Sequence, residues 1–237
     1  MSEERKKAAA RAALHEVQEG NVVGIGTGST AEAFIHLLAK RVRDGLYVEG
    51  IPTSERTAEL CRKLSIPLVT LGDRPVPDVT VDGADELDTQ LTLIKGGGGA
   101  LLREKIVAAA SRRMVVIADH TKKVERLGAF PLPVEVARFG VEPTRLAVAR
   151  VCRDHGMAGE LTLRTTQGEN GDAGPVETDG GNYILDAAMG AIEDAAALAR
   201  DLAAVPGVVE HGLFVGLAAA AYVAGPDGVE RIERSRD

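Results

Sequence analysis

Three short segments of the chain combine glycines with hydroxyl or charged side chains, a composition typical of sites for small anionic ligands. They are residues 24–30 (GIGTGST), 82–88 (DGADELD) and 95–99 (KGGGG). Each follows a short apolar run that predicts a β-strand. Ligands of open α/β sheets bind at the carboxyl ends of the strands, so we expect these segments at the ligand-binding edge of such a sheet.

The first segment leaves a predicted strand and opens a predicted helix. Its backbone N–H groups and the hydroxyls of Thr27, Ser29 and Thr30 converge at the positive helix end, which predicts an anion cradle. It is not a dinucleotide-binding loop, because Gly28 comes one residue early and residues 52–54 (PTS) offer no acidic ribose clamp. It also lacks the lysine of a P-loop. A tight turn with a Ser/Thr cap remains the alternative.

The second segment places two carboxylates, Asp82 and Asp85, at a strand end, with Gly83 and Ala84 between them. Carboxylates in this position are candidate acid/base groups. A solvated acidic turn is the alternative. A calcium loop of the EF-hand type is not supported, because the required glutamate spacing and flanking helices are missing.

The third segment starts with Lys95 and continues with four glycines. Glycines weaken any regular element but let backbone N–H groups approach a ligand oxygen, and the lysine adds positive charge. A flexible linker is the alternative, and the apolar strand and helix on either side argue against it. Glu104 alone would be read as a solvated helix residue. Close to the glycine segment and to Asp82 and Asp85, however, Glu104 could point over a ligand. The negative charges of the two aspartates would raise the pKa of Glu104 to a value suited to a general base.

Four further lysines, Lys6, Lys7, Lys122 and Lys123, occupy positions where lysine is more often a solvent-exposed charge. None of the five histidines has a partner at metal-ligand spacing, and the H-E-x-x-H pattern is absent. Metal catalysis therefore has no support in the sequence.

Alternating apolar runs and helical patterns over the first half predict a doubly wound, mostly parallel, Rossmann-like α/β sheet. The predicted strands are residues 22–25, 47–51, 67–69, 79–81, 91–94 and 113–118, and the predicted helices are residues 3–18, 30–43, 54–64 and 100–112. Residues 218–224 are expected to return to this sheet.

The order of elements over residues 132–213 is β-α-β-β-α-β, which predicts an inserted, smaller α+β ferredoxin-like domain. We therefore divide the chain into residues 1–131 plus 214–237, the catalytic domain, and residues 132–213. Within the second part, residues 165–181 read as an exposed loop and hairpin turn without chemistry.

The composition is that of an ordinary soluble globule, with 45% hydrophobic and 27% charged residues among 237. A net charge of −7 gives nucleic acid and anionic lipid no general attraction, so an anionic ligand needs a local basic pocket. No run of 18 apolar residues predicts a membrane span. Two cysteines without a paired pattern, and a charged N-terminus, lead us to expect a cytoplasmic protein.

Taken together, Thr27-Gly28-Ser29-Thr30, Asp82-Gly83-Ala84-Asp85, Lys95-Gly96-Gly97-Gly98 and Glu104 resemble the motifs of the ribose-5-phosphate isomerase type A family. The resemblance covers nearly the whole chain. It implies interconversion of D-ribose 5-phosphate and D-ribulose 5-phosphate in the non-oxidative pentose phosphate pathway, without metal or organic cofactor. It also implies a homodimer, with tetramers in some members.

Carried over by position, Glu104 looks like the base that moves a proton between C2 and C1 through an enediolate. The loop Thr27, Gly28, Ser29 and Thr30 looks like the phosphate and sugar cradle. By the same resemblance, Asp82 and Asp85 would bind sugar hydroxyls and assist ring opening, with Gly83 and Ala84 alongside. The developing oxyanion would meet Lys95 and the amides of Gly96, Gly97 and Gly98, Lys122 would be a further contact, and Lys6 or Lys7 would reach the phosphate.

Two other functions remain to be weighed. A sugar-phosphate-sensing module without catalysis could share this sheet, but no helix-turn-helix precedes it and a sensor has no need of Glu104 beside two aspartates. A nucleotide-dependent oxidoreductase would rest on the first glycine loop alone, which lacks the fingerprint.

Overall fold

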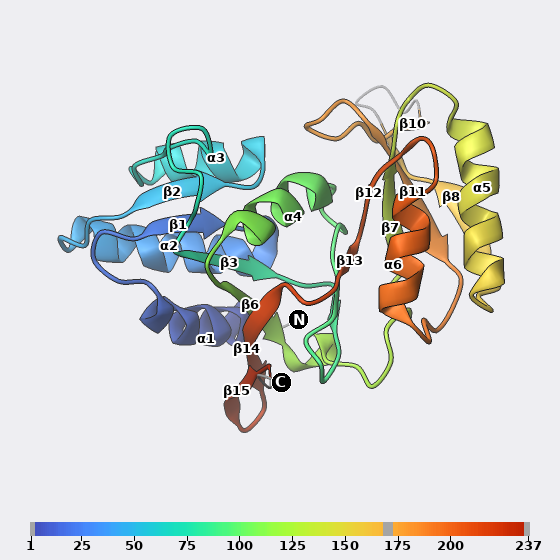
Figure 1. The fold of residues 1–237 in the computed structure, drawn as a ribbon. Coiled ribbons are helices and arrows are strands. Elements are labelled where there is room, and N and C mark those ends of the chain that lie inside the picture. The colour runs from blue at the N-terminus through green and yellow to red at the C-terminus, as the bar shows by residue number, and fades with distance from the viewer. Residues whose placement is uncertain (1–2, 168–172, 235–237) are drawn as a thin grey trace.

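The structure, a computed structural model, describes residues 3–167 and 173–234. Its larger sheet has the strand order β15-β14-β6-β3-β1-β2 (Figure 1), and neighbouring strands run parallel except in the β14–β15 hairpin. These strands are β1 (Val22–Ile25), β2 (Glu49–Pro52), β3 (Val79–Gly83), β6 (Met114–Asp119), β14 (Ala218–Gly225) and β15 (Gly228–Glu233). The mostly parallel sheet and the return of residues 218–224 to it are confirmed.

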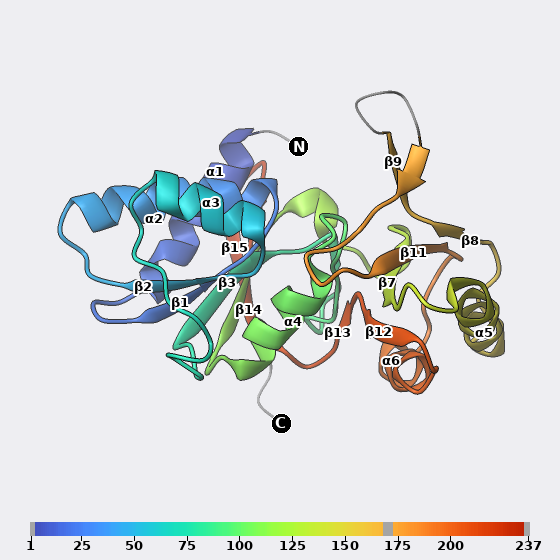
Figure 2. The same ribbon diagram turned by 90° about the horizontal axis from the view of Figure 1, so that it is seen from above.

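Helices lie on both faces of this sheet, with α1, α2 and α3 on one side and α4 on the other (Figure 2). They are α1 (Glu3–Ala13), α2 (Ser29–Arg43), α3 (Glu55–Lys63) and α4 (Leu101–Ala110), with short 3₁₀ turns η1 (Leu14–Glu16) and η2 (His120–Lys122). Strand β6 is buried throughout, and its side chains alternate between the two layers: Val115 and Ile117 pack with α1 and α2, whereas Met114 and Val116 face the opposite core. Burial on both faces explains the nearly continuous apolar sequence of this strand.

A short antiparallel sheet, β13-β5-β4, packs against the face of β6 and β14 that α1 does not cover. Its strands are β4 (Glu86–Leu87), β5 (Leu93–Ile94) and β13 (Leu213–Phe214). The predicted strand at 91–94 was wrong in its extent and its sheet, because Leu91 has a positive φ of 58° and turns the chain. The predicted strand at 67–69 is reduced to a single bridge between Leu68 and Gly50.

The second large sheet is antiparallel, in the order β12-β7-β11-β8, and α5 and α6 cover one of its faces (Figure 2). Its elements are β7 (Leu132–Val136), α5 (Val141–Asp154), β8 (Glu160–Leu163), β11 (Tyr183–Ala188), α6 (Ala195–Ala203) and β12 (Val208–His211). This strand order is the ferredoxin-like arrangement that the sequence predicted.

A hairpin of β9 (Thr165–Gln167) and β10 (Ala173–Pro175) extends from β8. Residues 168–172 of the predicted exposed loop lie outside the described residues. The division at residues 131/132 and 213/214 stays a prediction.

The chain crosses between the two large sheets before β7 and again after β12, at Gly212. The Gly212 N–H donates to the Pro133 carbonyl (2.7 Å), and the Gly212 carbonyl accepts from the Lys95 N–H (2.9 Å). A Cβ on residue 212 would lie 2.2 Å from the Lys95 carbonyl oxygen, so only glycine allows this close approach.

Burial in the core of the larger sheet makes one aromatic side chain important for the stability of the fold. Phe34 on α2 is fully buried, so Phe34→Ala should lower the free energy of unfolding by about 3–5 kcal/mol in urea denaturation. Phe139→Ala is the matched control, because Phe139 is 95% exposed and its truncation should stay within about 0.5 kcal/mol. Equal losses in the two variants would contradict this assignment of the core.

Candidate active site

A cavity of about 100 Å³ lies where the carboxyl ends of β1 and β3 meet the N-terminal ends of α2 and α4. All three predicted segments contribute to its wall. It is lined by Thr27, Gly28, Ser29, Thr30, Gly83, Ala84, Asp85, Lys95, Gly96, Gly98, Glu104 and Lys122.

The first segment forms the tight connection between β1 and α2. Gly28 has a φ of 110°, which favours glycine, and α2 begins at Ser29. A Cβ on Gly26 would lie 2.1 Å from Asp82 Oδ1, so the missing side chain lets β1 approach that carboxylate. The amide of Thr27 then donates to the same Oδ1 at 3.2 Å. The loop is therefore held by a buried aspartate, and the positive end of α2 faces the cavity.

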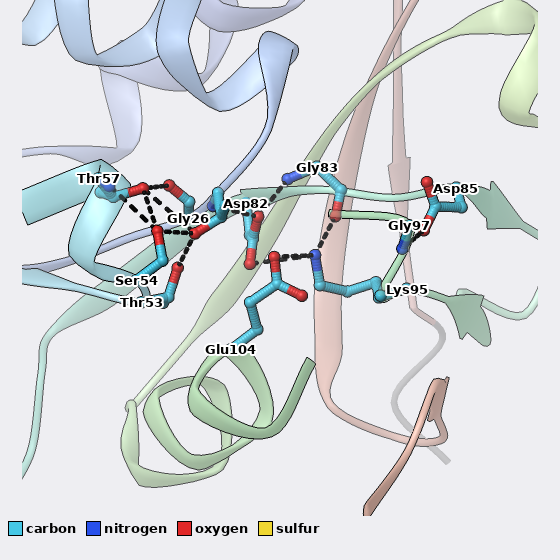
Figure 3. A network of polar contacts seen from close by, with 12 residues as sticks. Gly26, Thr53, Ser54, Thr57, Asp82, Gly83, Asp85, Lys95, Gly97 and Glu104 are labelled. Carbon is cyan, nitrogen blue, oxygen red and sulfur yellow. Dashed lines mark hydrogen bonds and ion pairs between the residues drawn. The ribbon is translucent and has the colours of Figure 1, made fainter. Parts of the chain in front are cut away.

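Thr27 belongs to a cluster of hydroxyls whose other members, Thr53, Ser54 and Thr57, are labelled in Figure 3. Thr27 Oγ1 lies 2.8 Å from Thr53 Oγ1, 2.8 Å from Ser54 Oγ and 3.2 Å from Thr57 Oγ1. Thr57 Oγ1 in turn donates to the Gly26 carbonyl at 3.0 Å. From the sequence, residues 52–54 were expected only to lack the acidic ribose clamp of a dinucleotide site. The available signal was that they end the strand next to β1, with Ser54 as the cap of α3.

The centre of the site is one lysine between two carboxylates (Figure 3). Lys95 Nζ lies 3.1 Å from Asp82 Oδ2 and 3.3 Å from Glu104 Oε1, and it donates to the Gly83 carbonyl at 2.7 Å. The three residues Asp82, Lys95 and Glu104 are 0%, 3% and 4% exposed. Asp82 is fully buried and is not among the residues that line the cavity, so its contact with a ligand stays a prediction.

Burial and neighbouring charges set the protonation of this group. The pKa of Glu104 is raised to about 8, first by burial and then by the negative charge of Asp82, while Lys95 opposes both effects. Burial would lower the pKa of Lys95, but Asp82 and Glu104 outweigh it and hold that pKa above its ordinary value. Lys95 therefore stays charged near neutral pH, while Glu104 is poised to take up and release a proton.

The backbone of Lys95 is anchored from the far end of the chain. Strand β5 ends directly before it and pairs with β13, whose Phe214 places its ring centroid 5.5 Å from Lys95 Nζ. A second ammonium, Lys105 Nζ, lies 5.0 Å from the same centroid. The buried aromatic ring thus flanks the site lysine with an electron-rich surface.

Asp85 accepts a hydrogen bond from one of the glycine amides, so that amide does not face the cavity. The Gly97 N–H donates to Asp85 Oδ2 at 2.7 Å, and Gly97 is not among the lining residues. This differs from the expectation that the amides of Gly96, Gly97 and Gly98 all face a ligand. The sequence placed the glycines together but did not show the direction of each peptide.

The remaining predicted lysines divide between the cavity and its surroundings. Lys122 lines the cavity, with its Nζ 5.8 Å from the Phe130 ring centroid. Lys6 is buried and pairs with Glu3 at 2.7 Å, away from the lining. Lys7 lines a neighbouring cavity that shares Ser29 with the site.

Within residues 3–167 and 173–234, no group of three or more His, Cys, Asp and Glu side chains could hold a metal ion. In the same part of the chain, no helix is long and apolar enough to cross a membrane.

Known proteins share this fold and much of this sequence. Residues 49–228 match the family model described as ribose 5-phosphate isomerase A (phosphoriboisomerase A). A ribose-5-phosphate isomerase A of Agrobacterium fabrum is 57% identical over 225 residues, 95% of each chain. The structure of ribose 5-phosphate isomerase A from Methanocaldococcus jannaschii is 41% identical with a TM-score of 0.87, covering 98% of this chain and 100% of that one.

A further solved structure is a D-ribose-5-phosphate isomerase in complex with phospho-erythronic acid. It is 36% identical with a TM-score of 0.88, and the match covers 99% of this chain and 100% of that one. These matches extend over nearly the whole chain and include the segments that line the cavity. The chain belongs to the ribose 5-phosphate isomerase A family.

Proposed function

We propose that the chain interconverts D-ribose 5-phosphate and D-ribulose 5-phosphate through an enediolate, with Glu104 as the base. Membership of the family supports the reaction. The observation that carries the mechanism is the Glu104 carboxylate itself, buried at the cavity wall with Oε2 lacking a hydrogen-bond partner. A buried carboxylate oxygen without a partner is costly unless a ligand supplies the missing contact.

Glu104 transfers a proton between adjacent carbons of the open-chain sugar. It takes the proton from C2 of the aldose, and the electron pair moves to the carbonyl oxygen on C1 to give the enediolate. The hydroxyl proton on O2 then moves to O1, and Glu104 returns its proton to C1 as the carbonyl forms at C2. A pKa raised to about 8 suits both halves of this transfer, because the group must accept and then release a proton near neutral pH.

Lys95 stabilises the enediolate by its charge. Its ammonium already has three oxygens within 3.3 Å, on Asp82, Gly83 and Glu104. Its positive charge acts strongly on the developing oxyanion in this desolvated site. The cavity-lining Gly96 and Gly98 are placed to offer direct hydrogen bonds from their amides.

Asp82 and Asp85 have different roles because only Asp85 lines the cavity. Asp85 lines the cavity and uses Oδ2 for the Gly97 amide, so Oδ1 is the oxygen that serves sugar hydroxyls and ring opening. Asp82 acts as a positioning residue, because it holds Lys95 and the Thr27 amide from beneath.

The phosphate group belongs at the start of α2. Ser29 and Thr30 supply hydroxyls and backbone amides at the positive helix end, and Lys122 adds a positive charge across the cavity. Of the two N-terminal lysines, Lys7 is the better candidate for a phosphate contact, because its cavity shares Ser29 with the site.

The family resemblance and the composition of the chain support a proposal for its assembly and location. We assign a cytoplasmic homodimer, with a tetramer as the alternative assembly. Both cysteines, Cys61 and Cys152, are free and buried.

Replacing the base tests the mechanism. Glu104→Gln should lower kcat by about 10²–10⁴-fold with little change in KM, because it removes the proton acceptor and keeps the shape. The measurement is ribulose 5-phosphate formation from ribose 5-phosphate by chelator-treated protein, with the exposed Glu125→Gln as control. Turnover of Glu104→Gln near that of the parent protein would overturn the base assignment. A parent protein that binds the sugar phosphate without turnover would favour the sensor.

The protonation of Glu104 predicts the pH dependence of kcat/KM, which reports the free enzyme. The base works in its deprotonated form, and its pKa is raised to about 8. Lowering the pH through this value should therefore reduce kcat/KM by about tenfold per pH unit. A profile that stays flat down to pH 6 would show that the carboxylate titrates near its ordinary value.

If the charge of Lys95 stabilises the enediolate, removing Lys95 should lower kcat far more than removing the surface lysine Lys123. Lys95→Ala should lower kcat by at least about 10²-fold, because the enediolate loses its counter-charge. Lys123→Ala should leave kcat within about twofold, since Lys123 pairs with Glu230 at 2.9 Å on the surface. Steady-state kinetics of both variants provides the test, and equal effects would refute the role given to Lys95.

A further inference from the structure

Arg164 connects the ferredoxin-like part of the chain to the glycine segment of the site. It follows β8, and its Nε donates to Asp186 Oδ2 on β11 at 2.7 Å, while Nη2 contacts the other carboxylate oxygen. Its third donor, Nη1, reaches the carbonyls of Gly96 at 2.8 Å and Gly97 at 3.3 Å. The Arg164 side chain is 16% exposed.

We infer that Arg164 is a positioning residue that sets the direction of the glycine amides at the enediolate, an assignment that rests on the proposed isomerase function. It does not line the cavity. Its effect on the reaction passes through the backbone of Gly96 and Gly97.

The rigidity of the peptide bond carries this effect. In a planar trans peptide the C=O and the following N–H point in opposite directions, so fixing one fixes the other. Arg164 holds the Gly96 carbonyl, and the N–H of the same peptide donates to Asp85 Oδ2 at 2.7 Å. It also holds the Gly97 carbonyl, whose peptide carries the N–H of cavity-lining Gly98. One guanidinium therefore orients both a sugar-binding carboxylate and a candidate oxyanion donor.

The glycine segment needs such an external anchor because side chains cannot hold it. Gly96 has a φ of 112°, and a Cβ there would lie 2.8 Å from Leu101 Cδ2. A Cβ on Gly97 would lie 2.7 Å from Asp85 Oδ1. Consecutive glycines without side-chain contacts have many accessible conformations, and a pre-organised donor site requires that they occupy one.

An arginine fits this role better than a lysine. The planar guanidinium binds the Asp186 carboxylate through two donors and still has a third for the carbonyls. The carboxylate also neutralises the arginine locally, so the pair directs the loop without competing for the phosphate of the substrate. A lysine in its place could reach one of these partners well, but not all of them.

The test compares two ligands that use different parts of the site. Phospho-erythronic acid carries a carboxylate that probes the glycine amides, whereas inorganic phosphate probes only the cradle at the start of α2. Arg164→Gln should weaken phospho-erythronic acid about 10-fold in calorimetry and leave phosphate within about twofold. It should also lower kcat for ribose 5-phosphate by about 10- to 100-fold.

Arg145→Gln is the matched control, because Arg145 also forms a two-donor pair, with Glu142 of the same helix. It should change neither affinity nor kcat. Arg164→Lys should give an intermediate loss, and it replaces Arg164→Gln if the latter does not fold.

Equal weakening of both ligands by the Arg164 variants, or no weakening of either, would overturn the positioning role. Failure of the proposed function gives a different result. The parent protein would then not convert ribose 5-phosphate, while the two binding comparisons would still report on Arg164.

Discussion

The site depends on a single buried ammonium, Lys95, held between the carboxylates of Asp82 and Glu104. Burying three charged groups is unfavourable unless each finds its partners, and two carboxylates facing one cation leave a proton to be shared. Burial, and after it the negative charge of Asp82, raises the pKa of Glu104, so the same burial that opposes stability makes a base suited to neutral pH. The buried cluster also requires glycines around it, because only residues without a Cβ, Gly26 and Gly212, let the backbone approach Asp82 and Lys95 so closely.

Much of the fold could be predicted because its strands are buried on both faces and its turns use distinctive residues. The apolar run around β6, the glycine loop before α2 and the order of elements in the ferredoxin-like part were predicted from local pattern alone. Strand β5 was misassigned, because its two residues pair with Leu213 and Phe214, far along the chain, and no local period reveals such a partner.

The site was predicted by residue type but not by orientation. Sequence spacing brought Asp82, Asp85, Lys95 and Glu104 together, and the structure confirms that they are neighbours. It could not show that Asp85 lines the cavity while Asp82 is buried outside the lining, because that depends on how the chain turns after β3. Arg164 was missed for a different reason, since its only local signal is an arginine near the end of a strand and its glycine partners come from a distant segment.

The crossover at Gly212 has a consequence for biosynthesis. The Lys95 amide is bound by the Gly212 carbonyl, and β14, which follows, lies between β6 and β15 in the larger sheet. A nascent chain that has emerged only as far as α6 lacks both the anchor of its lysine and an interior strand of the sheet. Long-range pairings of this kind slow folding, because the chain must close a large loop before the contacts form. The site is therefore anchored only once residues 212–225 have been synthesised, and a shorter nascent chain carries all three glycine segments without the contact that holds Lys95.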